Sequence, residues 1–462
     1  MRPSFVLSNL LYAGAVCCLL SGSVFAQQRS LSIREAVSLT REQQPQLRAQ
    51  QEQANAAAYS VGLAKNTLLP DLTASYQAGY ATYNNITGMT YPGGFLPISG
   101  PPSAGNTYDA VPGSVLSALL KWTPLTFGQR QAAVEKAAAQ YQVAASQYND
   151  ALFRQQYTVI ATYLDAVYLR SLTASYEANI ARTATGLNQA LVLAKEGLRP
   201  GIDTAQFQSV LAQAEMDLLT LQRRYFEQLA ELAKLTGLPA KPSELQLTDT
   251  AFLSNTPDAP AATGGTGGHP QLRLYESKKV LSEAALKEIQ RGWRPRFDVW
   301  ANAYARGSGV AADGSVDKTD GWSLSRKNYG LGVQLSFPIL GFAQANLQKK
   351  QYRSLLRADE AQLQQVSLNL QKQQETAQFN YDQQLLITRQ STVQTRTARF
   401  AFDGLKLGYE SGLIDYTRLM QGQYELLKAE TAQAGAYLQT WRALLDIAVA
   451  GGNLQTFLDT LK

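Results

Sequence analysis

The sequence has almost none of the side chains from which enzyme active sites and metal sites are built. Its 462 residues include one histidine, two cysteines and four methionines. Both cysteines, Cys17 and Cys18, lie near the N-terminus, and the histidine, His269, lies in a glycine-rich segment. Histidine pairs, cysteine clusters, acidic calcium-binding loops and phosphate-binding glycine motifs are absent. We therefore expect no catalytic residue, no cofactor and no metal site, and we expect His269 to be solvated.

The N-terminal residues have the pattern of an export signal. Arg2 gives a positive start, residues 10–20 are apolar, and small residues flank Phe25 as a cleavage site requires. We expect residues 1–26 to be removed as a signal peptide. The mature chain would then have no cysteine and could form no disulfide. A membrane anchor and a lipidated N-terminus are the alternatives that this pattern leaves open.

Beyond the signal, the chain has neither a long apolar run nor a basic patch. No later segment offers 18 consecutive apolar residues, so we expect no transmembrane helix. The net formal charge is +6, but acidic residues are interspersed with the basic ones, as between Arg130 and Lys136. An exported chain with this charge distribution does not fit a nucleic-acid-binding protein. The chain either stays soluble outside the cytoplasm or enters a membrane as strands.

Two halves of the sequence carry the same order of features. A proline closes a strand-like region in each half, and a glycine turn follows a long helical run. The prolines, Pro124 and Pro338, are 214 positions apart, and the glycines, Gly197 and Gly412, are 215 positions apart. Two independent landmarks with nearly the same offset indicate an internal duplication. We expect a first repeat over residues 27–239, a low-complexity joint over residues 240–270 and a second repeat over residues 271–462.

Each repeat contains a pair of segments in which apolar and polar residues alternate. In the clearest of them, Tyr329, Leu331 and Val333 alternate with Gly330 and Gly332. A period of two is typical of a strand with one apolar face, and about 9–11 residues are enough for a strand to cross a bilayer. A soluble sheet with one buried face is the alternative. We expect strands over about 71–84, 111–124, 296–306 and 327–340.

The rest of each repeat is predicted to be helical. Residues 129–195 contain no proline and only one glycine, Gly186, and a helix of that length would extend roughly 100 Å. Residues 342–407 form a second run of similar length, in which leucines seven positions apart indicate coiled-coil packing. Other helices are expected over about 31–68, 202–235 and 416–449.

The order of these features resembles that of the outer membrane efflux proteins, the TolC-like channels of Gram-negative bacteria. The resemblance covers the mature chain and is most specific in the proline-closed strand exits and the glycine turns. Residues 197–203 are similar to the first periplasmic tip of that family, and residues 409–415 are similar to the second. The family implies an α+β membrane protein. In it, a homotrimer forms a 12-stranded outer-membrane β-barrel that continues as a long periplasmic α-helical barrel.

The resemblance also implies a function and a set of partners. It implies a passive exit channel of a tripartite efflux system, with no enzymatic activity, in the cell outer membrane and with a large periplasmic portion. Small molecules would reach it from an inner-membrane pump and a periplasmic adaptor, and its other partners would be outer-membrane lipid and two further copies of the chain. One alternative is the outer-membrane channel of a type I protein secretion system. A more distant alternative is a trimeric coiled-coil surface fibre.

The resemblance assigns roles to residues at the two expected tips. Arg418 stands six positions after the second turn glycine, where some members of the family carry an aspartate. Opposite charges at the tips could hold the helix ends together, and the alternative is that these charges are exposed and unpaired. The expected tip and adaptor-docking residues are Gly197, Leu198, Gly201, Gly412 and Leu413, and the candidate gate residues are Asp203, Asp415 and Arg418.

Overall fold

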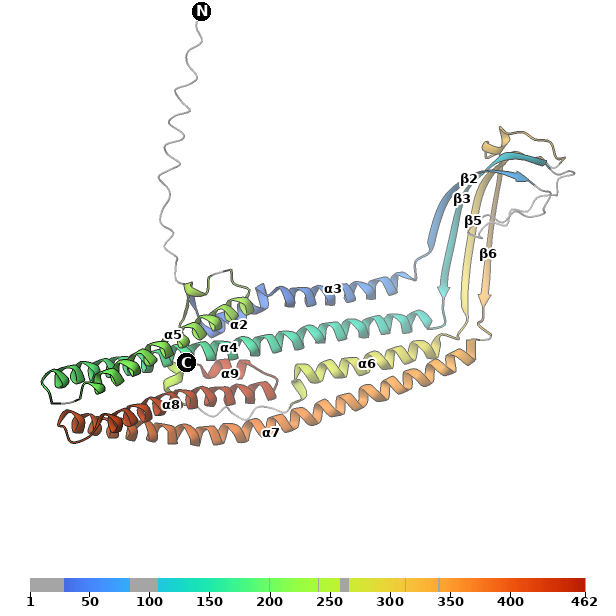
Figure 1. The fold of residues 1–462 in the computed structure, drawn as a ribbon. Helices are drawn as coiled ribbons and strands as arrows, with labels where there is room; N and C mark the ends of the chain where they lie inside the picture. The colour runs from blue at the N-terminus through green and yellow to red at the C-terminus, as the bar shows by residue number, and fades with distance from the viewer. Residues whose placement is uncertain are drawn as a thin grey trace, which may run out of the picture. The chain divides into compact units, whose positions relative to one another are not determined.

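The structure, a computed structural model, divides into two compact units that we describe separately (Figure 1). The expected signal peptide, residues 1–26, and most of the loop between the first two strands lie outside the described residues. The helical unit comprises Met1–Gln53, Ala145–Glu276 and Gln362–Lys462, and the sheet unit comprises Ala54–Ala144 and Ser277–Ala361. The described residues are 29–83, 107–198, 200–239, 241–257, 266–311, 313–339 and 341–461.

The sheet unit is built on one four-stranded antiparallel sheet. Its strands are β2 (Asp71–Tyr83), β3 (Thr107–Leu125), β5 (Arg296–Ser308) and β6 (Arg326–Ser336). Their order across the sheet is β2-β3-β5-β6, and each strand runs antiparallel to its neighbours (Figure 1). Strands β2 and β6 are therefore the two edges of the sheet.

One face of this sheet is apolar across its whole width. The register places Leu72 opposite Leu120, and it places Ala301 opposite both Leu120 and Leu331. Directly opposed residues point to the same side of a sheet, so these side chains share one face. Many of the large members are exposed in the single chain, and a face of this kind needs an apolar environment. The exposed large members are Leu72, Tyr76, Tyr80, Leu116, Trp122, Tyr329, Leu331, Val333 and Leu335.

The opposite face of the sheet carries small and polar residues. The hydroxyl oxygens of Ser75 and Ser117 lie 2.8 Å apart across β2 and β3. Leu119, Trp300 and Tyr304 are large residues on this face. The Trp300 indole covers Gly332, where a Cβ would lie 2.6 Å from the ring. The glycine of β6 therefore makes room for Trp300, which is a packing role that alternation alone does not reveal.

Two strands differ in length from the sequence prediction. β3 begins at Thr107 instead of residue 111. At its other end it continues past Pro124, because the pairing with β5 is irregular between Trp122 and Leu125. Such an irregularity leaves the proline outside the regular ladder. β5 continues to Ser308, two residues beyond the expected end.

The prediction that the last strand continues to residue 340 was wrong, because β6 ends at Ser336. Pro338 has no amide hydrogen to donate to a ladder. The chain turns there instead, and the amide of Gly341 donates to the carbonyl of Pro338 at 3.1 Å. Gly341 then begins the next helix.

The single helix expected over residues 31–68 is in fact two helices. α2 (Ile33–Gln43) and α3 (Pro45–Asn66) are separated by Gln44, whose ψ of 115° is extended. Proline disfavours the helical conformation in the residue before it. Pro45 itself begins α3, at the position where a missing amide hydrogen is tolerated.

The joint between the repeats contains more structure than a low-complexity segment predicts. β4 (Leu245–Leu247) pairs in parallel with β1 (Arg29–Leu31). The hydroxyl of Tyr163 donates to the Leu31 carbonyl at 2.9 Å, which attaches this small sheet to the long helix of the first repeat. The described part of the joint also contains three 3-10 helices: η1 (Pro242–Glu244), η2 (Ala251–Ser254) and η3 (Thr266–Gly268).

Long helices make up most of the helical unit. In the first repeat α4 (Gln129–Lys195) is followed by α5 (Ile202–Thr236), and in the second α7 (Gly341–Glu410) is followed by α8 (Tyr416–Ala450). Parts of α3, α4 and α7 also belong to the sheet unit. Among the described residues, no helix combines the length and the apolar character needed to cross a membrane. The remaining elements are α6 (Pro270–Arg291), η4 (Asp320–Trp322) and α9 (Gln455–Thr460).

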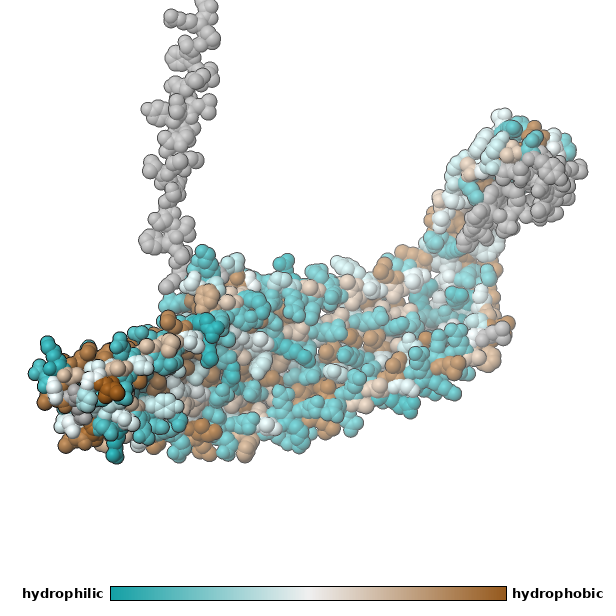
Figure 2. Space-filling model, viewed as in Figure 1, coloured by the Kyte–Doolittle hydropathy of each residue, from teal (hydrophilic) through white to brown (hydrophobic). Residues whose placement is uncertain are grey.

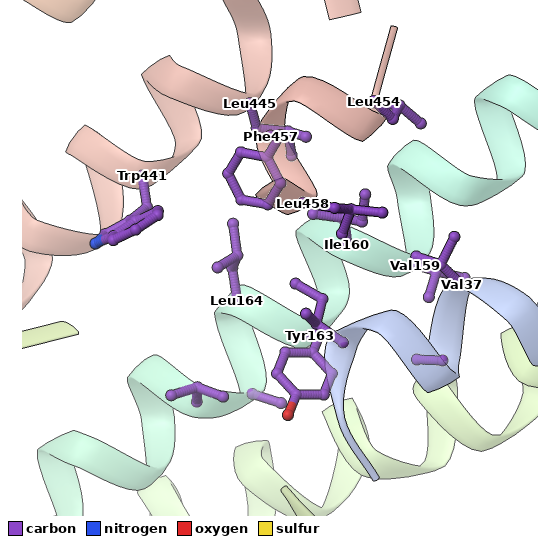
Figure 3. Packing of buried hydrophobic residues seen from close by; sticks show 14 of the residues in the cluster. Val37, Val159, Ile160, Tyr163, Leu164, Trp441, Leu445, Leu454, Phe457 and Leu458 are labelled. Carbon is purple, nitrogen blue, oxygen red and sulfur yellow. The ribbon is translucent and has the colours of Figure 1, made fainter. Parts of the chain in front are cut away.

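The core of the helical unit lies where α4 packs against α8 and α9. Ile160 and Leu164 of α4 are fully buried, and they belong to one apolar cluster with Leu445 and Phe457 (Figure 3). The Trp441 ring meets Phe457 edge-on, with centroids 6.1 Å apart. Burial of each such side chain contributes about 1.5–3 kcal/mol. This cluster holds the N-terminal helix, the long helix of the first repeat and the C-terminus in one unit.

Candidate functional site

The helical unit contains two long hairpins, α4–α5 and α7–α8. Both reverse direction through the same kind of turn. Gly197 has a φ of 69° and Gly412 has a φ of 76°, in the left-handed region that favours glycine. The amide of the residue after each glycine donates to the carbonyl five positions earlier, at 2.9 Å after α4 and at 2.8 Å after α7. These bonds define the Schellman ending of a helix. The two sequence-predicted turns are thus the points where α4 and α7 stop.

The turns expose apolar side chains at the ends of the helices. Leu198, Ile202 and Leu413 are all exposed, and apolar side chains gather at these ends in Figure 2. A Cβ added to any of the tip glycines would touch nothing within 4 Å. The residues expected to form the tips are therefore open to a partner: Gly197, Leu198, Gly201, Gly412 and Leu413.

An apolar cluster, which we call the tip cluster, lies directly behind the two turns. The Phe207 ring is fully buried and meets Tyr416 edge-on at 4.6 Å and Tyr409 at 6.2 Å between ring centroids. Its members come from α4, α5, α7 and α8, so the cluster joins the tip of the first repeat to the tip of the second. The buried members are Ala190, Phe207, Phe402, Tyr409, Leu419 and Leu426.

Two glycines inside helices make this packing possible. A Cβ on Gly186 of α4 would lie 2.3 Å from the Phe207 ring, and a Cβ on Gly422 of α8 would lie 2.4 Å from Leu405. Glycine within a helix costs about 1 kcal/mol relative to alanine. The close approach of these side chains is the reason that the helices carry glycine there.

The candidate gate residue Asp415 is a helix cap. Its carboxylate accepts a hydrogen bond from the Arg418 amide at 2.9 Å, and its extended backbone is the conformation of an N-cap residue. The Arg418 side chain is exposed. Within the described part of this single chain, neither Arg418 nor Asp203 makes an ion pair. The structure thus brings Asp415 to the backbone of Arg418 and not to its guanidinium group.

Asp203 acts on a tyrosine that the sequence analysis did not identify. Burial, with the nearby negative charge of Asp203 as a smaller cause, raises the pKa of the Tyr416 hydroxyl to about 12. This hydroxyl is buried and has no hydrogen-bond partner among the described residues of the chain. Asp203 and Tyr416 connect the start of α5 with the start of α8, next to the tip cluster.

Polar links between the hairpins were not predicted from the sequence either. Glu430 of α8 is buried, and its carboxylate accepts from Arg182 of α4 at 3.1 Å and from Arg399 of α7 at 2.8 Å. The amide of Gln189 donates to Glu410 at 2.9 Å. Arg182 and Glu430 are 248 positions apart, so no local spacing could have revealed the pair.

His269 is structural, and the expectation that it is solvated was wrong. Only 4% of it is exposed. Its Nε2 donates to the Val449 carbonyl at 3.1 Å, and the Gln271 amide donates to its Nδ1 at 3.1 Å. One donating and one accepting nitrogen require the neutral ring, and burial lowers the pKa of this imidazole. Among the described residues, no group of three His, Cys, Asp or Glu side chains could hold a metal.

Comparison with known proteins finds a match to one family model and several solved structures of the same fold. Residues 36–238 match the family model described as outer membrane efflux protein. The structure is similar to the outer membrane protein VceC of Vibrio cholerae, with a TM-score of 0.74, 14% identity and coverage of 91% of this chain and 96% of VceC. None of the curated proteins compared with the chain matches its sequence.

Two further outer membrane channels have the same fold. The CmeC channel of Campylobacter jejuni gives a TM-score of 0.73 at 12% identity and covers 91% of this chain and 86% of CmeC. The MtrE channel of Neisseria gonorrhoeae gives a TM-score of 0.68 at 15% identity, and the match covers 91% of this chain and 89% of MtrE. The resemblance of the sequence to the outer membrane efflux proteins is thereby confirmed, in sequence over residues 36–238 and in fold over 91% of the chain.

Proposed function

We propose that this chain is the passive outer-membrane exit channel of a tripartite efflux system in a Gram-negative bacterium. The observation that carries the proposal is the four-stranded sheet with one exposed apolar face and one polar face. The match to the outer membrane efflux family supports it. The chain is a transport channel and not an enzyme, with a large periplasmic portion formed by the helices. Small molecules reach it from an inner-membrane pump through a periplasmic adaptor.

Three copies of the chain complete the channel. Within the described part of a single chain, the edge strands β2 and β6 leave backbone amides and carbonyls without partners, and such edges are not tolerated in lipid. Four strands per chain cannot close a barrel, whereas three copies supply the 12 strands that the family resemblance implies. In this homotrimer the apolar face of each sheet meets outer-membrane lipid, and the polar face with Ser75, Ser117 and Trp300 lines the channel.

The exposed tips are the docking surface for the adaptor and the narrow entrance of the channel. Leu198 and Leu413 offer apolar contacts, and the left-handed glycines set the direction in which these leucines point. In the trimer Asp203, Asp415 and Arg418 each occur three times around the entrance. Arg418 holds the entrance closed through charged contacts to a neighbouring copy, while Asp415 keeps its role as the cap of α8.

The proposal is tested by deleting the gene in its native host and measuring intracellular accumulation of a fluorescent efflux substrate. We expect accumulation to rise and to return to the original level when the gene is supplied again, but only in cells that also contain the inner-membrane pump. Equal accumulation with and without the gene would overturn the proposal. Loss of a secreted protein from the medium, with accumulation unchanged, would favour the type I secretion channel instead.

A further inference from the structure

An apolar pocket lies in the sheet unit where β6 leads into α7. It has a volume of about 390 Å³ and is lined mainly by Trp293, Phe337, Pro338, Ile339 and Phe342. These side chains are large and apolar, yet Ile339 is 79% exposed in the single chain. The sheet and helices of one chain therefore build the walls of this pocket and leave it open.

A second exposed apolar group lies at the other edge of the sheet. Leu68 and Leu69 form the connection between α3 and β2, and Leu69 is 65% exposed. Hydrogen bonds hold this connection in place: the Trp122 indole donates to the Leu68 carbonyl at 2.8 Å, and Arg130 donates to the Thr67 carbonyl at 3.3 Å. The leucines are thus presented on a fixed backbone, which lowers the entropic cost of binding.

The direction of the strands relates these two surfaces. Because every neighbouring pair in the sheet is antiparallel, β6 runs opposite to β2. If β6 of one copy continues this alternation by pairing with β2 of the next copy, then Ser336, at the end of β6, lies beside Asp71, at the start of β2. The residues just before Asp71 then meet the residues just after Ser336.

We infer that the pocket is the docking site for a second copy of this chain, with Leu69 of the next copy seated among Trp293, Ile339 and Phe342. The inference rests on the proposed trimer. It adds a contact between the residues that follow β6 in one copy and the residues that precede β2 in the next copy. Three features favour a second copy as the occupant. The edges of the sheet are open, its strands are all antiparallel to their neighbours, and the backbone at Leu69 is fixed. A lipid acyl chain is the competing occupant, and the test separates the two.

Cysteine pairs test the contact directly, because the mature chain is expected to contain no cysteine of its own. A chain with Leu69→Cys and Ile339→Cys should form covalent trimers when purified trimers are treated with a short bifunctional thiol reagent. Each single variant should remain uncrosslinked. The control pair is Leu69→Cys with Leu331→Cys, since Leu331 is also exposed on β6 but lies five residues before its end; it should not crosslink.

A second variant pair keeps the test valid if a cysteine chain fails to assemble. Leu69→Ser should shorten the lifetime of the trimer in sodium dodecyl sulfate at least tenfold. Leu198→Ser should leave it unchanged, although Leu198 is exposed to a similar extent, 70% against 65%. Equal lifetimes for the two variants would overturn the inference.

The outcomes distinguish failure of this inference from failure of the proposed function. Intact trimers without the Leu69–Ile339 crosslink would overturn the docking site and leave the channel proposal standing. If native mass spectrometry of those trimers also found retained phospholipid that Phe342→Ser removes, the pocket would be a lipid site. A chain that purifies only as a monomer would overturn the trimer and this inference together.

Discussion

The Phe207 ring of α5 and the Tyr416 ring of α8 contact each other edge to face, with centroids 4.6 Å apart and planes inclined by 76°. The contact joins the returning helices of the two repeats just behind their tips. Because Phe207 is fully buried, the two hairpins cannot separate without exposing it to water. In the proposed channel, an opening of the entrance must therefore either move both tips together or break the tip cluster.

The packing of this cluster predicts opposite effects for two helix glycines. Gly186→Ala should lower the free energy of unfolding of the tip by about 1–3 kcal/mol, because the new Cβ overpacks against Phe207. Gly404→Ala is the matched control in α7, where a Cβ would meet nothing within 4 Å, and it should raise stability by roughly 0.5–1 kcal/mol. Amide hydrogen exchange in α5 and at the start of α8 measures the change in stability of both variants. Equal protection in the two variants would contradict this account of Gly186.

The turn glycines are predicted to matter for their backbone conformation. Gly412→Val should strain the turn by roughly 1–2 kcal/mol, since a residue with a Cβ is disfavoured at positive φ. Gly62→Val is the control, because Gly62 lies in α3 away from the tips, has no positive φ, and a Cβ there would also meet nothing within 4 Å. We expect Gly412→Val to weaken binding of the adaptor to purified trimers while trimer assembly is preserved. Adaptor binding as strong as that of Gly62→Val would show that the turn has no docking role.

The buried histidine predicts a dependence of stability on acid pH. In the folded chain the pKa of His269 is lowered by burial, and the charge of Arg154 acts in the same direction, against the Val449 hydrogen bond and the charge of Asp150. The unfolded chain therefore binds a proton at a higher pH, near the ordinary pKa of about 6.5. The stabilising contribution is complete above that pH and is lost as the pH falls toward the lowered folded value, by about 1.4 kcal/mol for each unit of difference.

Thermal unfolding of the chain between pH 7 and pH 4.5 tests this assignment. His269→Gln removes the titrating group and should flatten the part of the pH profile just below 6.5. The same slope in the variant and in the original chain would show that His269 is not the source of this acid sensitivity.

The two charged residues next to the second turn are predicted to have different roles. Asp415→Ala should destabilise the start of α8 by about 1 kcal/mol, because it removes the cap of the helix, and Asp415→Ser should restore most of this loss. Arg418→Ala should leave stability unchanged, because the side chain is exposed. It should raise single-channel conductance and the permeability of cells to large antibiotics. Unchanged conductance with an intact trimer would leave Arg418 as a surface charge.

Local patterns in the sequence were enough to find the long elements. The alternation around Tyr329 located β6, and the absence of proline between residues 129 and 195 located α4, because both signals repeat along one segment. The break at Pro45 carried a local signal that the helical composition of its neighbours concealed. β1 and β4 have only three residues each, which is too short for a period of two to be visible.

The contacts that organise the tips could not be predicted in the same way. Gly186 looks like a tolerated helix glycine until Phe207, on another helix, is seen to occupy the space above it. His269 looks like a loop residue until the C-terminus of α8 is seen to supply Val449 as its partner. Such pairs depend on how distant helices pack, and a single sequence contains no spacing that encodes them.

The central claim is that copies of this chain enclose a water-filled pathway across the outer membrane. The most direct measurement is electrical recording from the purified protein in a planar lipid bilayer, with the number of chains in the inserted particle determined by native mass spectrometry. The account predicts discrete conductance steps from a particle of three chains. A stable monomer that inserts no conducting pore would contradict it.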